Sequence, residues 1–364
     1  MNDIGELRQF IGVHARAQAI APRRCAEVLG RIRTDEEGAP DSWAACWSRE
    51  AAASSRARRH LEASRLFNIA RFPYVDGPAR REALESCISS FETWRRDHPA
   101  IERLDVTLPS GRVRCWTIGL DRVPRRPLLL AIGGIVSIKE QWAPALLQIA
   151  RLGMAGVVAE MPGVGENTIP YGPESWRMIG GILDAVADRA SVTQTYAMAL
   201  SFSGHLALRA ATEDTRIRGI VTAGAPVHDF FTDTDWQRRV PRVTTDTMAH
   251  LAGVEPGRLG TEISGWALSP ARLAALDIPV SYVVSRRDEI IPPADARLLR
   301  DHVRRTDHVE NDDVHGSPGH LPETRLWMVE SILRMRGTHR VQRAALGSLG
   351  RLIRARRRLV GATR

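Results

Sequence analysis

The stretch "AMALSFSGHLALR", residues 197–209, places a serine between a short apolar run and a helical pattern. The run at 196–200 has the length and composition of a buried strand, and a helix is expected over 204–211. A serine at such a corner is typical of a nucleophile elbow, whose usual pattern is G-x-S-x-G. Here Ala199 and Ser203 occupy the glycine positions around Ser201, and Gly204 follows one place later. A helix N-cap is the alternative role for this serine.

The residues on both sides of this stretch predict alternating strands and helices. Residues 102–120 read as a hairpin, and short β-branched apolar runs follow within 126–134, 153–163, 193–200, 216–226 and 277–285. A last strand is expected at 307–310. The helices expected between them include one that runs to Leu152 and one around 176–189. This alternation is typical of a mostly parallel sheet.

The chain divides by its patterns into three parts. Residues 1–100 carry apolar positions at helical spacing and predict a helical N-terminal cap. Residues 101–336 predict the catalytic α/β domain, in which 228–268 form a helical excursion over the edge of the sheet. Residues 337–364 form a basic C-terminal tail, for which an amphipathic helix and a frayed end are the two interpretations.

Reactive side chains follow the predicted strands in an informative order. A serine needs a base to take its proton, and the base needs an acid to orient it. Asp288 follows the strand that ends near residue 285, with Glu289 as its rival. His315 lies in a glycine-rich loop after the last strand, with His320 as its rival.

The order Ser, Asp, His predicts the α/β-hydrolase fold, because other serine hydrolases use other orders. A ligand in such a sheet binds beyond the carboxyl ends of the strands. Gly133 and Gly134 follow the first long buried run, so the amide of Gly134 or Ile135 is expected to face an oxyanion. The amide of Phe202, directly after the serine, is the second expected donor.

Four segments resemble the FrsA-like esterases, a group that includes 2,6-dihydroxypseudooxynicotine hydrolase and the fungal polyketide-shortening hydrolases. They are "AIGGIVSIKEQW", "AEMPGVGEN", "ALSFSGHLALRAA" and "SRRDEIIPPADA", within a similarity over roughly residues 55–335. The resemblance implies Ser201 as nucleophile, Asp288 as acid and His315 as base. His315 is preferred because Leu333 lies 18 residues beyond it, which suits the closing helix of the fold.

Other positions bear on the substrate. His228 and Asp229 match a region where members of the group place groups that face the substrate, and loop polar residues are the alternative reading. Trp142 and Tyr171 are further candidates for substrate contacts. The sequence also departs from the group, with Val136 where an acid is frequent and with the elbow glycines replaced. These departures concern substrate and rate more than fold.

Composition limits the partners. The net charge is +9, but arginine is spread through every segment, so no nucleic-acid binding is expected. No run approaches the ~18 apolar residues of a membrane span, so no stable membrane insertion is expected, and neither is a secretion signal. Four scattered cysteines predict neither a zinc site nor disulfides and fit a reducing cytoplasm. No metal or cofactor is called for, and the helical N-terminal part is a candidate homodimer surface.

The first hypothesis is therefore a serine hydrolase that cleaves an ester, a thioester or a carbon–carbon bond beside a carbonyl. Its substrate would be hydrophobic, resembling polyketides of specialised metabolism and antibiotic biosynthesis, as a small molecule or bound to an acyl carrier. A second hypothesis keeps the fold but eliminates a carboxylic acid such as acetate from an acylated intermediate. A third is a catalytically silent binding scaffold.

Overall fold

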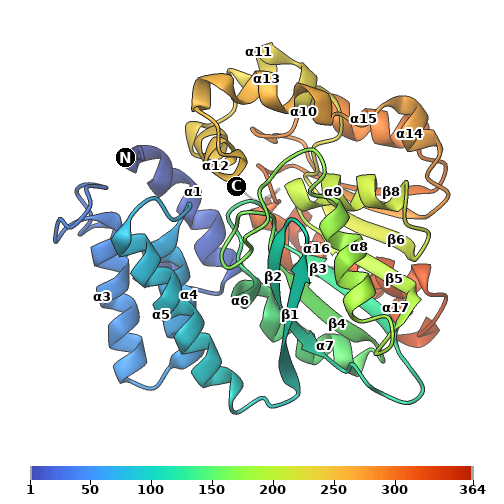
Figure 1. The fold of residues 1–364 in the computed structure, drawn as a ribbon, viewed down its shortest axis with the longest axis horizontal. Coiled ribbons are helices and arrows are strands. Elements are labelled where there is room, and N and C mark those ends of the chain that lie inside the picture. The colour runs from blue at the N-terminus through green and yellow to red at the C-terminus, as the bar shows by residue number, and fades with distance from the viewer. Residues whose placement is uncertain (1, 362–364) are drawn as a thin grey trace.

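The computed structural model describes residues 2–361, and within them eight strands form a single sheet of order β1-β2-β4-β3-β5-β6-β7-β8 (Figure 1). The strands are β1 (Ile101–Leu108), β2 (Gly111–Ile118), β3 (Pro127–Ile132), β4 (Ala155–Ala159), β5 (Ser191–Ala199), β6 (Ile217–Ala223), β7 (Val280–Ser285) and β8 (Thr306–Asn311). The strands β1 and β2 form an antiparallel hairpin, and β2 is antiparallel to β4. From β4 to β8 all neighbours are parallel.

Helices surround this sheet. Before the sheet come α1 (Ile4–Ala17), α2 (Pro22–Leu29), α3 (Trp43–Arg56), α4 (His60–Arg71) and α5 (Pro78–Arg95). Between and after the strands come α6 (Lys139–Trp142), α7 (Leu146–Arg151), α8 (Arg177–Ala185), α9 (Phe202–Ala211), α10 (Asp229–Thr232), α11 (Thr234–Gln237), α12 (Arg242–Ala252), α13 (Leu259–Ile263), α14 (Pro270–Ala274), α15 (Pro293–His302), α16 (Leu321–Met335) and α17 (Arg340–Gly361). Short 3-10 turns complete them at Ala143–Ala145, Pro256–Arg258, Ser264–Trp266 and Pro318–His320.

Successive residues of the buried strands face opposite sides of the sheet. Leu129 packs in one cluster with Met328 and Ile332 of α16 and with residues of α7. Its neighbour Leu128 belongs to the larger cluster that contains residues of α8 and α9. The sheet is therefore covered by helices on both faces, which is why its central strands are apolar throughout.

The N-terminal helices lie beside the sheet, and α10–α13 lie over one end of it (Figure 1). Helix α1 connects the two regions. Glu6 of α1 accepts hydrogen bonds from the amides of Arg242 and Val243, at 3.1 and 2.7 Å, where α12 begins. Arg325 of α16 donates to the carbonyl of Ala17 at 2.9 Å. The first helix is thus anchored to both the excursion and the end of the α/β part.

Three local expectations need correction or completion. The helix expected to run to Leu152 is broken into α6, a 3-10 turn and α7, because Pro144 lacks the amide hydrogen that a continuous helix requires. Helix α8 ends at Ala185, four residues before the expected 189. The basic tail is helical over Arg340–Gly361, and its residues 362–364 lie outside the described part of the chain.

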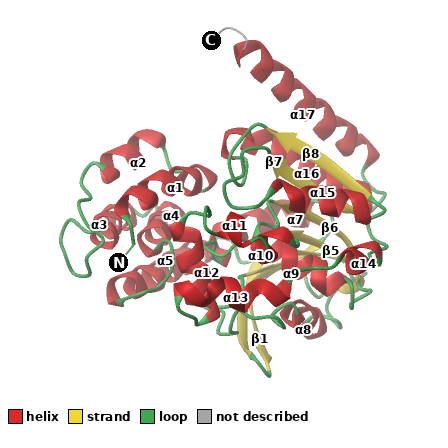
Figure 2. Ribbon diagram, turned by 90° about the horizontal axis from the view of Figure 1, so that it is seen from above, coloured by secondary structure: helices red, strands yellow, loops and turns green. Residues whose placement is uncertain are grey.

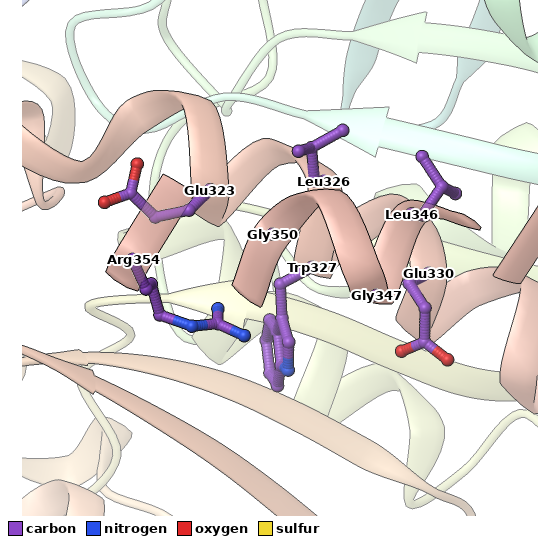
Figure 3. Close-up of a pocket in the computed structure, with 8 residues that line it drawn as sticks. All are labelled: Glu323, Leu326, Trp327, Glu330, Leu346, Gly347, Gly350 and Arg354. Atoms are coloured by element: carbon purple, nitrogen blue, oxygen red, sulfur yellow. The ribbon is translucent and has the colours of Figure 1, made fainter. Parts of the chain in front are cut away.

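Helix α17 packs along α16 and extends away from the N-terminal helices when the molecule is seen from above (Figure 2). A pocket of about 30 Å³ lies between α16 and α17 (Figure 3). Its volume is that of roughly one water molecule, so it has no room for a substrate. No helix among the described residues is both long and apolar enough to cross a membrane.

Candidate active site

Ser201 forms the corner between β5 and α9. Its backbone has φ 57° and ψ −131°, a conformation that side-chain-bearing residues rarely adopt. The corner is held by the Ser201 amide, which donates to Ala223 O at 2.8 Å, and by the Gly204 amide, which donates to Ser201 O at 2.8 Å. The serine hydroxyl therefore projects from a sharp strand-to-helix turn.

The residues that replace the elbow glycines fit the turn. Ala199 and Ser203 are fully buried, and Ser203 Oγ donates to the carbonyls of Ile132 and Leu200, both at 2.9 Å. Gly204 is where a side chain has no room, because a Cβ there would lie 2.6 Å from Ala225 Cβ. The position that must be glycine has moved one place along the chain.

Three predicted residues meet at this corner. Ser201 Oγ lies 2.9 Å from His315 Nε2, and His315 Nδ1 lies 2.9 Å from Asp288 Oδ2. With Nδ1 protonated, as its contact with the carboxylate requires, Nε2 accepts the hydrogen bond from the serine hydroxyl. The Asp288 carboxylate is held in turn by the amides of Ile290 and Ile291, at 3.0 and 2.8 Å.

The two rival residues have other partners. Glu289 accepts a hydrogen bond from the backbone amide of His315 at 2.9 Å, so it fixes the loop and leaves the imidazole to Asp288. His320 Nδ1 lies 2.8 Å from Asp313 Oδ2, in a separate pair. The geometry that links serine, imidazole and carboxylate belongs to His315 and Asp288.

The environment of His315 favours its protonated form. Burial disfavours the imidazolium, but the charge of Asp288 and its hydrogen bond outweigh burial and raise the pKa of His315 above 6.5. Gly224, at φ 57°, lies against the ring, since a Cβ there would be 2.6 Å from His315 Cε1. The imidazole therefore lies directly against the backbone of a residue that has no side chain.

The loop after β3 brings backbone amides to the serine. A Cβ on Gly134 would lie 3.1 Å from Ser201 Cβ, and one on Gly133 would lie only 2.5 Å from Ser137 Cβ and Trp142 Nε1. Within residues 2–361 the amides of Gly134, Ile135 and Phe202 donate to no backbone or side-chain acceptor. An amide without an acceptor in the protein can donate to an oxygen atom of a ligand, and all three expected donors meet this condition.

A buried charged cluster, which the sequence reasoning missed, supports this loop. Lys139 is 1% exposed and lies 2.8 Å from Glu140, 3.4 Å from Glu160 and 2.8 Å from Glu166. Burial disfavours its charge, but the three carboxylates outweigh burial and raise the pKa of Lys139. Glu160 also accepts from the amides of Lys139 and Glu166, so the loops after β3 and β4 are held together. One signal existed, since Lys139 is the only lysine in the sequence.

The N-terminal helices also reach the site. Arg71 of α4 donates from Nη2 to the carbonyl of Val136 at 2.7 Å, inside the loop after β3. His14 of α1 makes no hydrogen bond from its ring to the described residues. Burial first, then the charges of Arg71 and His315, lower the pKa of His14 to about 4. No sequence motif pointed to either residue. Arg71 in particular could not be singled out in a chain with arginine in every segment.

The four candidates for substrate contacts are placed differently. Trp142 lies against Gly133 in the loop after β3, and its buried Nε1 has no hydrogen-bond partner among the described residues. The same holds for the Tyr171 hydroxyl and for His228 Nδ1. The amides of His228 and Asp229 donate to Asp295. Within residues 2–361, Tyr171, His228 and Asp229 form no hydrogen bond to Ser201, Asp288 or His315.

Metal ligation has no structural basis in the described residues, where no group of three His, Cys, Asp or Glu side chains is arranged to hold an ion. An open hollow of about 410 Å³ lies on the excursion, lined by residues around His250 and Arg258. It contains none of the residues that meet at the elbow.

Comparison with known proteins settles the family. The family model described as "Esterase FrsA-like" matches residues 42–303, more than half of the chain. The chain belongs to the FrsA-like esterase family. Within it, esterase FrsA of Escherichia coli O157:H7 is 23% identical over 258 residues, which are 66% of this chain and 62% of that esterase. The chain thus spans less than two thirds of that relative. Esterase FrsA of Vibrio vulnificus (strain YJ016) is 20% identical over 318 residues, 78% of this chain and 77% of that one.

Solved structures agree with this membership. The structure of AbyA5 superposes with a TM-score of 0.93 at 51% identity, covering 97% of this chain and 100% of the other. The 2,6-dihydroxy-pseudo-oxynicotine hydrolase superposes at 0.67 with 16% identity, covering 84% and 90%, which shows a shared fold. The expected α/β-hydrolase fold and the resemblance to FrsA-like esterases are confirmed. This family member is an α/β-hydrolase enzyme.

Proposed function

We propose that this FrsA-like protein is a serine hydrolase that works through an acyl-enzyme. The observation that carries the proposal is the continuous contact from Ser201 Oγ to His315 Nε2 and from His315 Nδ1 to Asp288, at 2.9 Å each. Ser201 attacks the substrate carbonyl while His315 takes the hydroxyl proton. The amides of Ile135 and Phe202 bind the oxygen that becomes negative, and Asp288 stabilises the imidazolium.

The two halves of the reaction use the same groups. When the tetrahedral intermediate collapses, the bond to the leaving group breaks and His315 returns its proton to that group. Water then attacks the acyl-serine, again losing its proton to His315, and a second collapse releases the acid and restores the Ser201 hydroxyl. No electrons are exchanged with a cofactor in this sequence.

The surroundings of Ser201 and the membership of an esterase family support a proposal for the substrate class. We propose an ester or thioester of a hydrophobic, polyketide-like compound from specialised metabolism, with a ketone carbon–carbon bond as the further option. Aromatic side chains of the excursion adjoin the elbow; Phe202, for example, contacts Phe230 of α10 at 5.1 Å between ring centroids. Four buried, unpaired cysteines support a reducing cytoplasm as its location.

A fluorophosphonate probe tests the nucleophile. We expect mass spectrometry to locate the probe on Ser201 in the wild type. Labelling should vanish in Ser201→Ala and fall at least ~10³-fold in His315→Ala, because the hydroxyl loses its base. His320→Ala is the matched control and should label at nearly the wild-type rate. A wild-type protein that leaves the probe unreacted would contradict the acyl-enzyme mechanism.

A β-acyloxy ketone separates hydrolysis from elimination. With 4-acetoxy-2-butanone in H₂¹⁸O, hydrolysis yields 4-hydroxy-2-butanone and acetate that carries one ¹⁸O. Elimination, in which a base removes the proton beside the ketone, yields methyl vinyl ketone and unlabelled acetate. We expect labelled acetate, and unlabelled acetate with the enone would replace the proposal by the elimination reaction.

A further inference from the structure

Arg71, the last residue of α4, carries a buried guanidinium group whose acceptors are all uncharged oxygens. Nη1 donates to Pro73 O at 3.0 Å, and Nη2 donates to Asn68 Oδ1 and to Val136 O, both at 2.7 Å. The residue is 2% exposed. Among the described residues it forms no ion pair. Burial lowers the pKa of Arg71 to about 10, and the charges of Glu160 and Glu140, which form no ion pair with it, oppose this shift. The group therefore stays charged at neutral pH.

A nearby arginine shows the usual alternative. Arg80 of α5 is 3% exposed, and it pairs with Asp35 and, at 2.8 Å, with Asp76. A buried charge is costly unless it is paired. Two loops of the N-terminal part thus supply carboxylates that pair with Arg80, whereas Arg71 has only uncharged hydrogen-bond acceptors. This difference suggests that the position of Arg71 serves the groups to which it donates.

The acceptor Val136 O begins a short hydrogen-bonded chain that ends at the elbow. The peptide group that contains Val136 O also contains the Ser137 amide, which donates to Gly134 O at 3.0 Å. The peptide group that contains Gly134 O also contains the Ile135 amide. Two peptide groups therefore connect the guanidinium with the amide that has no acceptor. Hydrogen bonds in such a chain polarise one another.

We propose that Arg71 is a positioning residue, which orients and polarises the Ile135 amide through these two peptide groups. The inference rests on the proposed function, in which that amide binds the developing oxyanion. A positive charge at the head of the chain draws electron density from Ile135 N–H and makes it a stronger donor. The N-terminal helices are in this way part of the reaction machinery and more than a cover.

Arg71 acts through the loop and does not touch the substrate. Its Nε is buried without an acceptor among the described residues, and the whole side chain is nearly inaccessible. The Lys139 cluster holds the loop through the amide of Lys139. The contact at Val136 O adds a second restraint, from α4, on the side of the loop nearer Gly134.

Paired substitutions at two equally buried arginines test the inference. Arg71→Met and Arg71→Lys are compared with Arg80→Met and Arg80→Lys in the full chain, with folding checked by circular dichroism and urea unfolding. The rate constant for fluorophosphonate labelling is the first readout. The second is the amide signal of Ile135 in protein labelled with [¹⁵N]isoleucine, assigned by its loss in Ile135→Val.

We expect Arg71→Met to label about 10-fold more slowly, a fraction of the 10²–10³-fold that removal of a whole oxyanion donor costs. Its Ile135 proton signal should move upfield. Arg71→Lys should lie between Arg71→Met and the wild type because it restores the charge, and it carries the test if the methionine variant does not fold. The Arg80 variants should lose stability while both readouts stay close to the wild type.

The inference is overturned if the folded Arg71 variants label within two-fold of the wild type, or if the Arg80 variants lose as much rate. An unmoved Ile135 signal would overturn it equally. A wild type that does not label at Ser201 instead refutes the proposed function. In that case the Ile135 signal alone decides whether Arg71 polarises the amide.

Discussion

Ser201 combines a strained backbone with a close-packed neighbourhood. A conformation of this kind costs of order 1–3 kcal/mol and persists only where the surrounding structure enforces it. Here β5, α9 and two backbone hydrogen bonds enforce it. Gly224 lies against the ring of His315 and leaves room for it, since a Cβ there would be 2.6 Å from Cε1. The serine is thus held by its backbone, and the imidazole by its hydrogen bond to Asp288.

The raised pKa of His315 predicts the acid limb of the pH profile. Only the neutral imidazole can accept the serine proton, so the labelling rate should rise with pH through the pKa of His315, which lies above 6.5. Asp288→Asn removes the charge that raises this pKa. We expect this variant to shift the limb to lower pH and to lower the rate by about 10⁴-fold.

The measurement is the pH dependence of the fluorophosphonate labelling rate between about pH 4.5 and 9, spanning the ordinary histidine pKa. His320→Ala serves as the control and should keep the wild-type limb, because His320 pairs with Asp313. A limb that stays in place in Asp288→Asn would show that a different group titrates.

At the scale of elements, the loops after β3 and β4 depend on one buried cation. Lys139→Met would leave Glu140 and Glu160 without the cation that they contact, while Glu166 keeps its pairs with Arg114 and Arg103. We expect a loss of about 3–5 kcal/mol in the free energy of unfolding, since removing one partner leaves an uncompensated buried charge. The measurement is urea unfolding at neutral pH.

Arg177→Met is the matched control for this substitution. It removes the cation of an ion pair with Glu174 whose side chains are 67% and 63% exposed, and it should cost less than about 0.5 kcal/mol. Equal losses in the two variants would mean that the cluster around Lys139 contributes no more than a surface ion pair. The difference between the variants isolates the effect of burial.

The strands and the main site residues could be predicted from the sequence, whereas the residues that support the site could not. The strands and the Ser, Asp, His order were readable because apolar runs and reactive strand ends are local features. The break at Pro144 was also local, yet the apolar pattern on both sides concealed it. Arg71 and His14 lie near the site on helices whose packing depends on contacts between distant residues. No periodicity distinguishes Arg71 from the many arginines that face solvent.

At the scale of the whole molecule, the net charge of +9 predicts how a substrate on an acidic carrier protein would bind. Raising the salt concentration should increase the KM for such a carrier-bound acyl thioester roughly five-fold between about 50 and 500 mM, because screening weakens long-range attraction. The same acyl group on N-acetylcysteamine is uncharged and should show no change.

Steady-state kinetics with the two thioesters at several salt concentrations make this comparison. If KM changes equally for both thioesters, the salt effect belongs to the enzyme itself. If KM stays constant for both, the charged carrier is not the preferred form of the substrate. The two thioesters share the acyl chain, so the comparison concerns only what carries it.

The anchoring of α1 has a consequence for the newly synthesised protein. Its partners at α12 and α16 leave the ribosome more than 200 and 300 residues later, respectively, as the separations of 237 and 308 residues show. Helix α1 can therefore form these contacts only after synthesis has passed residue 325. A polypeptide that stops before residue 315 lacks His315 as well as the contact with α16. In the proposed mechanism such shorter polypeptides are inert.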